Sequence, residues 1–326
     1  MEAGVDRPTA AEEPFGSLEG LWRASREHLG WGCPFVSPPW VRAWRHTLGT
    51  AVEPWILSVR KGGRLAGVAV LARRGARVGF LGSPDVCDYF DLAAAPGDET
   101  DVLWAVVEHA RARGASGLDL GPVREDSVVA RAAAGLPGFR VLPDGAAVEM
   151  PLPAGWGDYL ERLGRKERHE VRRKIRRVER SGTVRRYTAG PADVDRALAV
   201  FLDLFRRSRP DKAAFLTPPR EAFFRALARE TAAAGWLRLS VVELDGRPAA
   251  AVLSFQCGGV RYLYNNGFDP EFRNLSIGIV SKVWDIRDAI AEGAARYEFL
   301  KGTETYKFRL GGREVPLVRC VTGGTP

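Results

Sequence analysis

The sequence predicts an α/β protein of the α+β type that contains two domains, and three observations support this prediction. The chain has 326 residues, of which 45% are hydrophobic, enough to bury two ordinary cores. Segments with strand composition alternate with segments of helical periodicity along the whole length. The order of these segments in the first half recurs in outline in the second half.

The first half begins with a polar segment, residues 1–14, for which we expect a disordered leader. Short tryptophan-rich helical segments follow at 18–29 and 39–47. Residues 99–114 have the periodicity of a helix that stops at Gly114. Strands are expected at 54–60, 64–73, 76–82, 89–95 and 116–123, with a closing hairpin formed by 139–143 and 146–153.

The second half repeats this plan. Amphipathic helices are expected at 193–208 and 218–235, and the second of these starts with two prolines, which suit a first helical turn. Asp245-Gly246 is a strong hairpin turn signal between two strand segments. Strands are expected at 236–246, 247–259, 260–268 and 296–302, with a helix at 277–293.

The two halves share one local order. "HARARGASGLDLG" (109–121) and "AIAEGAARYEFLKG" (289–302) both run from a helix end through Gly-Ala to a strand and a glycine. This order predicts two copies of one α/β unit, with domains at 15–153 and 154–326. Two unrelated halves that share only β-α-β order would give the same pattern, and that alternative stays open.

Cysteines and histidines are few and scattered. The four cysteines form no CxxC pair, which is typical of free thiols in a reducing compartment. The four histidines are equally dispersed, so no metal site is expected. The acidic N-terminus does not resemble a signal peptide, and no apolar run reaches the ~18 residues that span a membrane. We expect a cytoplasmic protein without membrane insertion.

The charge of the chain is concentrated in one segment. The net charge is +8, and residues 159–187 contain twelve Lys/Arg against four Asp/Glu. The helical spacing of this segment places four arginines together on a face other than that of a narrow apolar stripe: Arg165, Arg168, Arg172 and Arg176. Such a row indicates an anionic ligand, although a solvated helix face would also be basic. DNA is not favoured, because there is no helix-turn-helix signal.

The loops that precede the two comparable helices differ in charge. In the second half the loop contains Arg273, Asn274, Leu275, Ser276, Ile277 and Gly278. Small residues there would let free N–H groups of the first turn bind an anion, whereas an ordinary helix capped by Ser276 is the plain alternative. The first-half loop has Asp98, Glu99 and Asp101, which would repel a phosphate.

Three blocks carry a resemblance to a known family. "YNNGFDPEFRNLSIGIV" followed by "YEFLKGTETYKFRLG" is similar to the C-terminal part of CelD-type acetyltransferases, and "YLERLGRKERHEVRRKIRRVERSG" resembles their Arg-rich segment. These proteins belong to the GNAT superfamily and are related to the Fem-type transferases, which contain two GNAT-like units. The resemblance covers about residues 156–312 and implies tandem GNAT-like domains, each with a mixed, mostly antiparallel sheet flanked by helices, the first copy being degenerate.

The resemblance also implies a donor and a donor loop. Residues 273–278 match the loop that wraps the CoA pyrophosphate, with Ser276 where the usual Arg/Gln-x-x-Gly-x-Gly/Ala pattern has its first glycine. Acetyl-CoA, or another acyl-CoA, is the expected donor, and no metal is required. Two splayed strands, near 262–267 and 297–302, would hold the thioester.

Acyl transfer to an amine requires a proton acceptor and a proton for the departing thiolate. Glu304 is the best candidate base, with Asp269 second and Tyr306 as the proton donor. Tyr264 and Lys307 are expected to contact substrate. Plain alternatives are a turn for Asp269-Pro270 and mutual pairing of Glu304 with Lys307.

We therefore expect an N-acyltransferase, in the first place an N-acetyltransferase, that acts on a sugar, an amino acid or a cell-envelope or polysaccharide precursor. One alternative is a Fem-type peptidyltransferase that uses aminoacyl-tRNA. Another is a non-catalytic RNA-binding protein on a decayed transferase fold. The sequence carries no signal for an oligomeric state.

Overall fold

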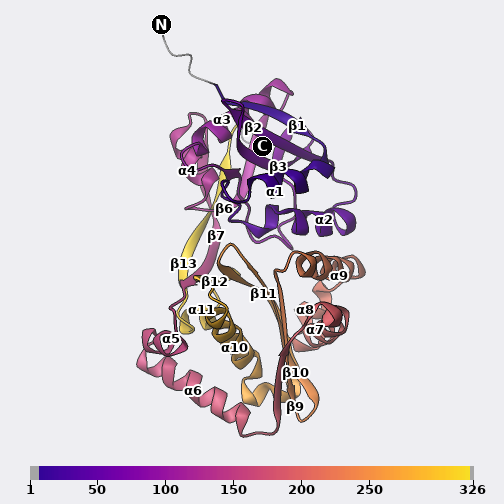
Figure 1. Ribbon diagram of the computed structural model, residues 1–326, viewed down its shortest axis with the longest axis vertical. Coiled ribbons are helices and arrows are strands. Elements are labelled where there is room, and N and C mark those ends of the chain that lie inside the picture. The colour runs from indigo at the N-terminus through magenta and orange to yellow at the C-terminus, as the bar shows by residue number, and fades with distance from the viewer. Residues whose placement is uncertain (1–6, 324–326) are drawn as a thin grey trace. The chain divides into compact units, whose positions relative to one another are not determined.

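The computed structural model describes residues 7–323, which form two compact units (Figure 1). The first unit is Met1–Ala146 with Val315–Pro326, and the second is Ala147–Glu314. The expected single division after residue 153 differs from these bounds, which lie after Ala146 and after Glu314. Residues 315–321 belong with the first unit because they pair with one of its strands, and residues 147–151 pair with a strand of the second.

The sheet of the first unit has the strand order β1-β2-β3-β4-β6-β13, with the short β5 paired to β3. Neighbouring strands are antiparallel, except that β4 and β6 are parallel. Their bounds are β1 Thr9–Glu13, β2 Pro54–Lys61, β3 Arg64–Arg74, β4 Arg77–Phe80, β5 Ala93–Ala94, β6 Gly117–Arg124 and β13 Arg313–Val321.

The helices of the first unit follow the expected periodicities with one addition. They are α1 Leu18–Ser25, α2 Pro38–Thr47, α3 Glu99–Ala112 and α4 Val128–Gly135, with 3-10 turns η1 Phe15–Ser17 and η2 Pro34–Val36. The sequence did not indicate α4, which Ser127 caps by accepting a hydrogen bond from the Ala130 N–H. Helix α3 packs against α4 and against the sheet.

Two expectations for this half are wrong. The leader is not disordered at residues 9–13, because β1 pairs with β2 and Ser58 donates a hydrogen bond to Glu13; residues 1–6 lie outside the described part. The expected closing hairpin is one continuous strand, β7 Arg140–Pro151. Its Asp144-Gly145 turn signal is overridden by strand pairing, and Asp144 binds Arg319.

The sheet of the second unit has the order β7-β12-β11-β10-β9-β8. It too is antiparallel except for one parallel pair, β11 with β12. The bounds are β8 Val184–Thr188, β9 Leu237–Leu244, β10 Arg247–Cys257, β11 Val260–Phe268 and β12 Arg296–Lys301. Asp245 and Gly246, both at positive φ, make the predicted turn between β9 and β10.

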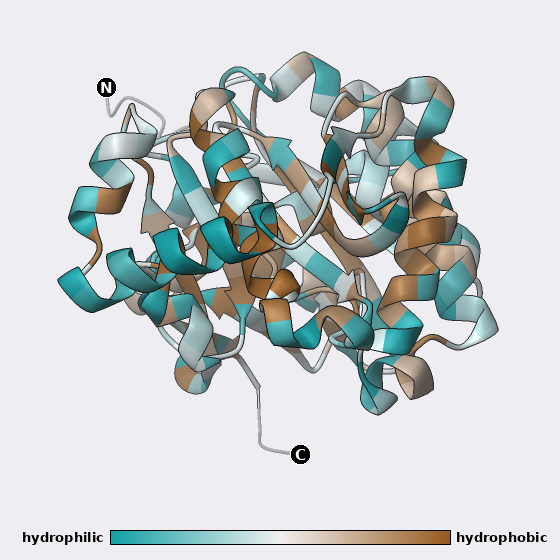
Figure 2. Cartoon of the chain, turned by 90° about the horizontal axis from the view of Figure 1, so that it is seen from below, coloured by the Kyte–Doolittle hydropathy of each residue, from teal (hydrophilic) through white to brown (hydrophobic). Residues whose placement is uncertain are grey.

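Helices cover both faces of this second sheet: α10 lies on one face, and α7 lies on the other (Figure 1). Mainly aliphatic residues form the core on the α10 side, whereas Phe201, Phe205 and Phe224 pack together on the α7 side. The strands in the interior are largely hydrophobic (Figure 2). The helices are α5 Trp156–Arg162, α6 Arg165–Glu179, α7 Val194–Ser208, α8 Pro210–Phe215, α9 Pro218–Ala233, α10 Ile277–Ala291 and α11 Thr305–Arg309, with η3 Pro191–Asp193 and η4 Pro270–Leu275. Among residues 7–323, no helix is both long enough and apolar enough to cross a membrane.

Candidate functional site

The parallel strand pair of the second unit opens after three residues. The ladder joins Val260–Tyr262 to Arg296–Glu298 and ends there. On β11 the register shifts at Tyr264, and on β12 it shifts at Phe299. Leu300 follows at φ 64°, a left-handed conformation that is costly for a leucine. The two strands therefore separate next to α10, α8 and α11.

The loop before α10 has the geometry of an anion site. Ser276 lies at φ 57°, the left-handed conformation that favours glycine, which explains why the family pattern has a glycine there. It makes no side-chain cap, so the plain capping interpretation of Ser276 is wrong. Among the described residues, nothing accepts a hydrogen bond from the N–H groups of Ile277 and Gly278. The first turn also has no acidic residue.

The six loop residues divide by burial. Leu275 and Ile277 point into the core, so only their backbone faces a ligand. Arg273 and Asn274 are exposed, and Ser276 and Gly278 are half-buried. A Cβ at Gly278 would lie 2.9 Å from the ring of Phe268, so this position requires glycine for packing as well as for backbone approach.

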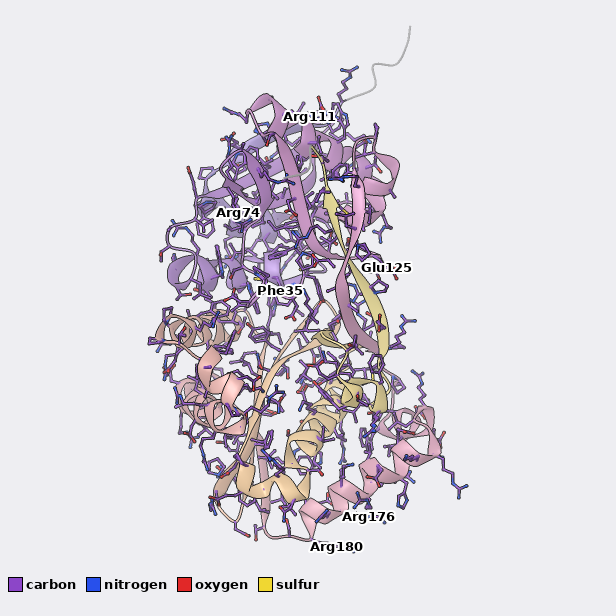
Figure 3. The ribbon with its side chains drawn as sticks, turned by 180° about the vertical axis from the view of Figure 1, so that it is seen from behind. Phe35, Arg74, Arg111, Glu125, Arg176 and Arg180 are labelled. Carbon is purple, nitrogen blue, oxygen red and sulfur yellow. The ribbon has the colours of Figure 1, made fainter. Side chains whose placement is uncertain are left out.

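Helix α6 packs against α10 and η4 through Val171 and Val178. Of the four expected arginines, Arg168 is half-buried, and Arg165, Arg172 and Arg176 are exposed. None of them forms a side-chain hydrogen bond or ion pair with a residue in the described range. Figure 3 marks Arg176 and Arg180 near the C-terminal end of this helix. By contrast, Glu170 on another face pairs with Arg173 and Lys174, whose hydrogen bonds lower its pKa to about 2.

A different row of α6 lines a cavity of about 210 Å³. The cavity lies between α6, the first turn of α10 and α11, and the four arginines do not line it. Its cationic residues are Lys166, Lys174 and Arg309, and Tyr306 and Ile279 form part of its apolar wall. The cavity is narrow, mixed in polarity and adjacent to the anion site at α10.

Lys307 is buried and organises the segment after β12. Its ammonium donates to the carbonyl oxygens of Leu300, Lys301 and Gly302 at 3.2, 2.7 and 3.0 Å. It also pairs with Glu304 at 2.9 Å. These four acceptors saturate the ammonium, so Lys307 positions the loop rather than contacting substrate with a free N–H.

Glu304 and Tyr306 both face this loop. The side chain of Glu304 is 58% exposed. Burial acts to raise its pKa, but the hydrogen bond from Lys307 and nearby positive charge leave it below the usual value. Burial, and then the charge of Glu304, raise the pKa of Tyr306, so its hydroxyl keeps its proton at neutral pH. Glu304 is thus a partly exposed carboxylate paired with Lys307, and Tyr306 is a protonated phenol.

Two lysines that the sequence did not single out complete the cluster. Lys282 on α10 is 6% exposed, donates to the carbonyl oxygen of Gly278 at 2.8 Å, and lies 4.8 Å from the centre of the Tyr306 ring. Burial, followed by the charge of Lys212, lowers the pKa of Lys282 to about 7. Lys212 on α8 donates to the Asn266 carbonyl oxygen, and burial lowers its pKa to about 8. A lysine within the apolar run "IGIVSKVW" is the signal that could have identified Lys282.

The two remaining candidates have structural roles. Asp269 is buried, binds Arg207 at 3.0 Å and accepts the Glu271 N–H at 3.0 Å, so it fixes the turn into η4 and is not free to act as a base. The ring of Tyr264 packs between Phe224 and Phe255. The plain alternative, a turn at Asp269-Pro270, describes this segment.

Comparisons with known proteins agree with this architecture. A family model described as an acetyltransferase (GNAT) domain matches residues 165–308. No curated protein matches the sequence. Among solved structures, FemX is similar with a TM-score of 0.66 at 13% identity, covering 95% of this chain and 96% of that chain. A tandem GNAT protein from the clavulanic acid biosynthesis pathway has a TM-score of 0.51 at 15% identity, with 98% and 100% covered.

A conserved protein of unknown function from Bacteroides thetaiotaomicron is also similar, with a TM-score of 0.67 at 12% identity, and 97% and 99% of the two chains are covered. At these identities the structures establish the fold and nothing finer. The chain has the tandem GNAT-like fold, and residues 165–308 of its second unit match the model of the GNAT domain. This confirms the expected fold class.

Proposed function

We propose that the second unit is an acyl-CoA-dependent N-acyltransferase, in the first place an N-acetyltransferase, with its donor pyrophosphate at the start of α10. The observation that carries this proposal is the pair of unbonded N–H groups at Ile277 and Gly278, after a left-handed Ser276 and without an acidic first turn. A helix N-terminus of this kind favours an anion. Arg273 adds an exposed cation beside it.

The separated strands and the amine cluster fit the rest of the reaction. The neutral acceptor amine attacks the thioester carbon, the C–S bond breaks, and the amine loses a proton. Glu304 binds the incoming ammonium, because it is an exposed carboxylate. Lys282 takes up the proton that the bound ammonium loses before attack, since a group with a pKa near 7 is well matched to general base work at neutral pH. Tyr306 gives its proton to the departing thiolate and regains one from the nitrogen as the amide forms.

The donor site is tested by titrating the full-length protein with CoA and acetyl-CoA in a calorimeter. We expect micromolar binding, weakened about fivefold in Asn274→Asp, since one charge beside a bound phosphate is worth about 1 kcal/mol at a surface. Asn274→Gln is the matched control and should bind like wild type. Gly278→Asp is a poorer choice because its side chain would also collide with Phe268. Unchanged binding in Asn274→Asp would place the donor elsewhere.

Activity is then measured as CoA release with amino sugars, amino acids and amines of polysaccharide precursors. Glu304→Gln should raise KM for the amine more than it lowers kcat. Lys282→Met should lower kcat and remove the acidic limb of the pH profile near pH 7. Full activity in both variants would exclude this assignment of roles.

The exposed arginine row of α6 supports a second candidate, in which the donor is an aminoacyl-tRNA. It predicts no CoA binding, but tRNA binding that falls steeply with salt and is weakened by Arg172→Ala with Arg176→Ala. A turnover assay with charged tRNA separates a Fem-type peptidyltransferase from a non-catalytic RNA-binding protein.

A further inference from the structure

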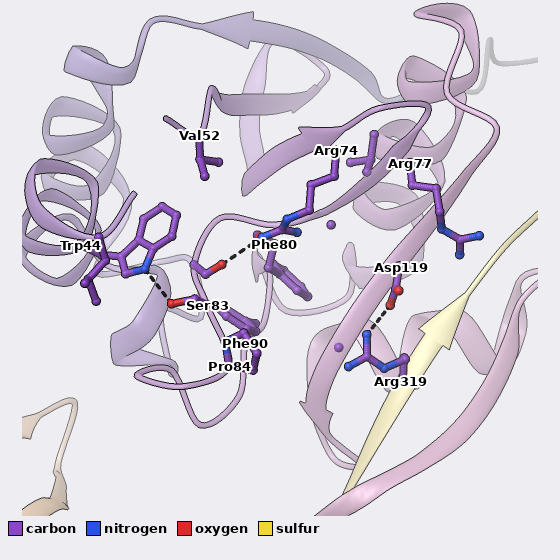
Figure 4. Close-up of a pocket in the computed structure, with 15 residues that line it drawn as sticks. Trp44, Val52, Arg74, Arg77, Phe80, Ser83, Pro84, Phe90, Asp119 and Arg319 are labelled. Carbon is purple, nitrogen blue, oxygen red and sulfur yellow. Dashed lines mark hydrogen bonds and ion pairs between the residues drawn. The ribbon is translucent and has the colours of Figure 1, made fainter. Parts of the chain in front are cut away.

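A cavity of about 520 Å³ lies within the first unit (Figure 4). This volume is within the range of small-molecule sites, about 300–1,000 Å³. The cavity is bounded by the end of α2, by strands β4 and β6, by the segment after β4 and by Arg319 on β13. All of these segments belong to the first unit.

Backbone features, rather than loose packing, create this cavity. The ladder between β4 and β6 ends at Gly79 and Asp119. Beyond it the chain leaves the sheet at Gly82 and returns at Phe90, whose N–H donates to the carbonyl oxygen of Pro122. A Cβ at Gly79 would lie 2.9 Å from the Asp119 carbonyl oxygen, and a Cβ at Gly121 would lie 2.9 Å from Arg319. Glycines therefore form part of the cavity wall, where any side chain would collide.

The lining carries excess positive charge. Arg319 is neutralised by Asp119 at 2.6 Å and by Asp144 at 2.8 Å. Among residues 7–323, Arg74 donates only to the carbonyl oxygens of Phe80 and Gly82, at 3.3 and 2.9 Å, and no carboxylate there neutralises its charge. Arg77 is half-buried and forms no side-chain hydrogen bond or ion pair with any residue from 7 to 323. Two of the three guanidinium groups are thus available to an anion.

The cavity lining also contains aromatic side chains. Trp44, Phe80 and Phe90 line it, and the indole N–H of Trp44 donates to the hydroxyl of Ser83 at 3.0 Å, which fixes the ring (Figure 4). Leu48 and Val52 continue the apolar wall. Flat aromatic walls favour a flat apolar group, and guanidinium groups favour carboxylate or phosphate.

We propose that this cavity is a binding site for a small amphipathic anion, a carboxylate or phosphate ester that carries a flat apolar group. The anionic end contacts Arg77 and Arg74, and the apolar group packs on Trp44 and Phe90. The site is independent of the donor site in the second unit. Its ligand is a separate substrate or an effector of the first unit, and neither the fold nor the acyltransferase proposal requires it.

The test uses phenyl phosphate, phenylacetate and the neutral phenylacetamide as probes of the full-length protein, measured calorimetrically at low ionic strength. We expect at least one of the two anions to bind at least tenfold more tightly than the amide. Arg77→Gln should weaken anion binding about tenfold, the loss of one charge-assisted contact of about 1.5 kcal/mol. Arg77→Lys should recover part of it.

Arg60→Gln is the matched control, because Arg60 is exposed in the same unit, bonds only to its own hairpin and does not line the cavity. Leu48→Trp, which fills the apolar side, should weaken binding of all three probes. Tighter binding of phenyl phosphate would indicate that the ligand is a phosphate ester, and tighter binding of phenylacetate would indicate a carboxylate. Equal binding of amide and anions, or equal losses in Arg77→Gln and Arg60→Gln, would overturn the proposal.

Discussion

Replacing Lys282 with methionine should stabilise the protein, and by an amount that depends on pH. Lys282 is buried, and its pKa falls from 10.5 to about 7. Each unit of pKa shift corresponds to about 1.36 kcal/mol. At a pH where the unfolded chain protonates this amine, the lowered pKa therefore reduces the free energy of unfolding by up to roughly 5 kcal/mol. Methionine has a similar shape and no charge, so the variant avoids that cost.

The sign follows from proton binding. The folded pKa lies below the unfolded one, so the folded state holds fewer protons between pH 7 and pH 10.5. The cost is full below pH 7 and disappears as the pH rises toward 10.5. Methionine loses the hydrogen bond to the Gly278 carbonyl oxygen, worth about 1 kcal/mol. The net gain should therefore be about 2–4 kcal/mol at pH 6 and close to zero at pH 10.

The assay is urea unfolding of both proteins at pH 6, 8 and 10, followed by far-UV circular dichroism, with hydrogen exchange of α10 to assign the transition that moves. Lys166→Met, an exposed lysine on α6, is the control and should show no such pH dependence. A difference between Lys282→Met and wild type that stays constant from pH 6 to pH 10 would refute the reasoning. So would a loss of stability at pH 6.

Two further predictions concern the frame around the site. Ser276→Gly should stabilise the protein by up to about 1 kcal/mol in urea unfolding, because the left-handed backbone conformation is unfavourable for serine but not for glycine. This change should leave CoA binding intact. The control Ser276→Ala keeps a Cβ at the same φ and should give no gain in stability. Asp285→Asn should destabilise by about 3–5 kcal/mol, because Asp285 is buried between Arg261 at 2.6 Å and the Tyr297 hydroxyl at 2.7 Å. The control Asp288→Asn removes the partly exposed ion pair with Arg186 and should destabilise the protein by less than about 1 kcal/mol. Equal destabilisation by Asp285→Asn and Asp288→Asn would contradict the argument.

Strong local patterns made most of the fold predictable. The Asp245-Gly246 turn and the helix at α10 follow directly from turn chemistry and periodicity. The errors occur where tertiary pairing overrides local composition. Strand β1 is the polar segment "TAAEE", which is held by β2, and β7 continues through a Pro-Asp-Gly sequence because neighbouring strands pair with it.

The candidate site was only partly predictable for a related reason. The Arg-x-x-Ser-x-Gly pattern predicts residues 273–278 as the donor loop, because small residues at fixed positions indicate the backbone conformation of the loop. Lys282 acquires its depressed pKa only through burial beneath Tyr306 and beside Lys212, which no local pattern records. Conversely, Asp269 and Lys307 look reactive in the sequence, but the fold surrounds Asp269 with arginines and Lys307 with carbonyl groups.

The two units have one topology but differ in the residues at the start of the helix that joins their parallel strands. In each, a parallel strand pair is joined by a helix, α3 in the first unit and α10 in the second. At the start of α3, Asp98 is held by Lys61 at 3.1 Å and Arg64 at 2.6 Å, and the Glu99 carboxylate accepts the Gly97 N–H. These side-chain carboxylates already occupy the place where a helix start would favour an anion. At the start of α10 the same place has free N–H groups and no acid in the first turn, which fits the pyrophosphate proposed there. The anion proposed for the cavity of the first unit would be bound by side chains instead.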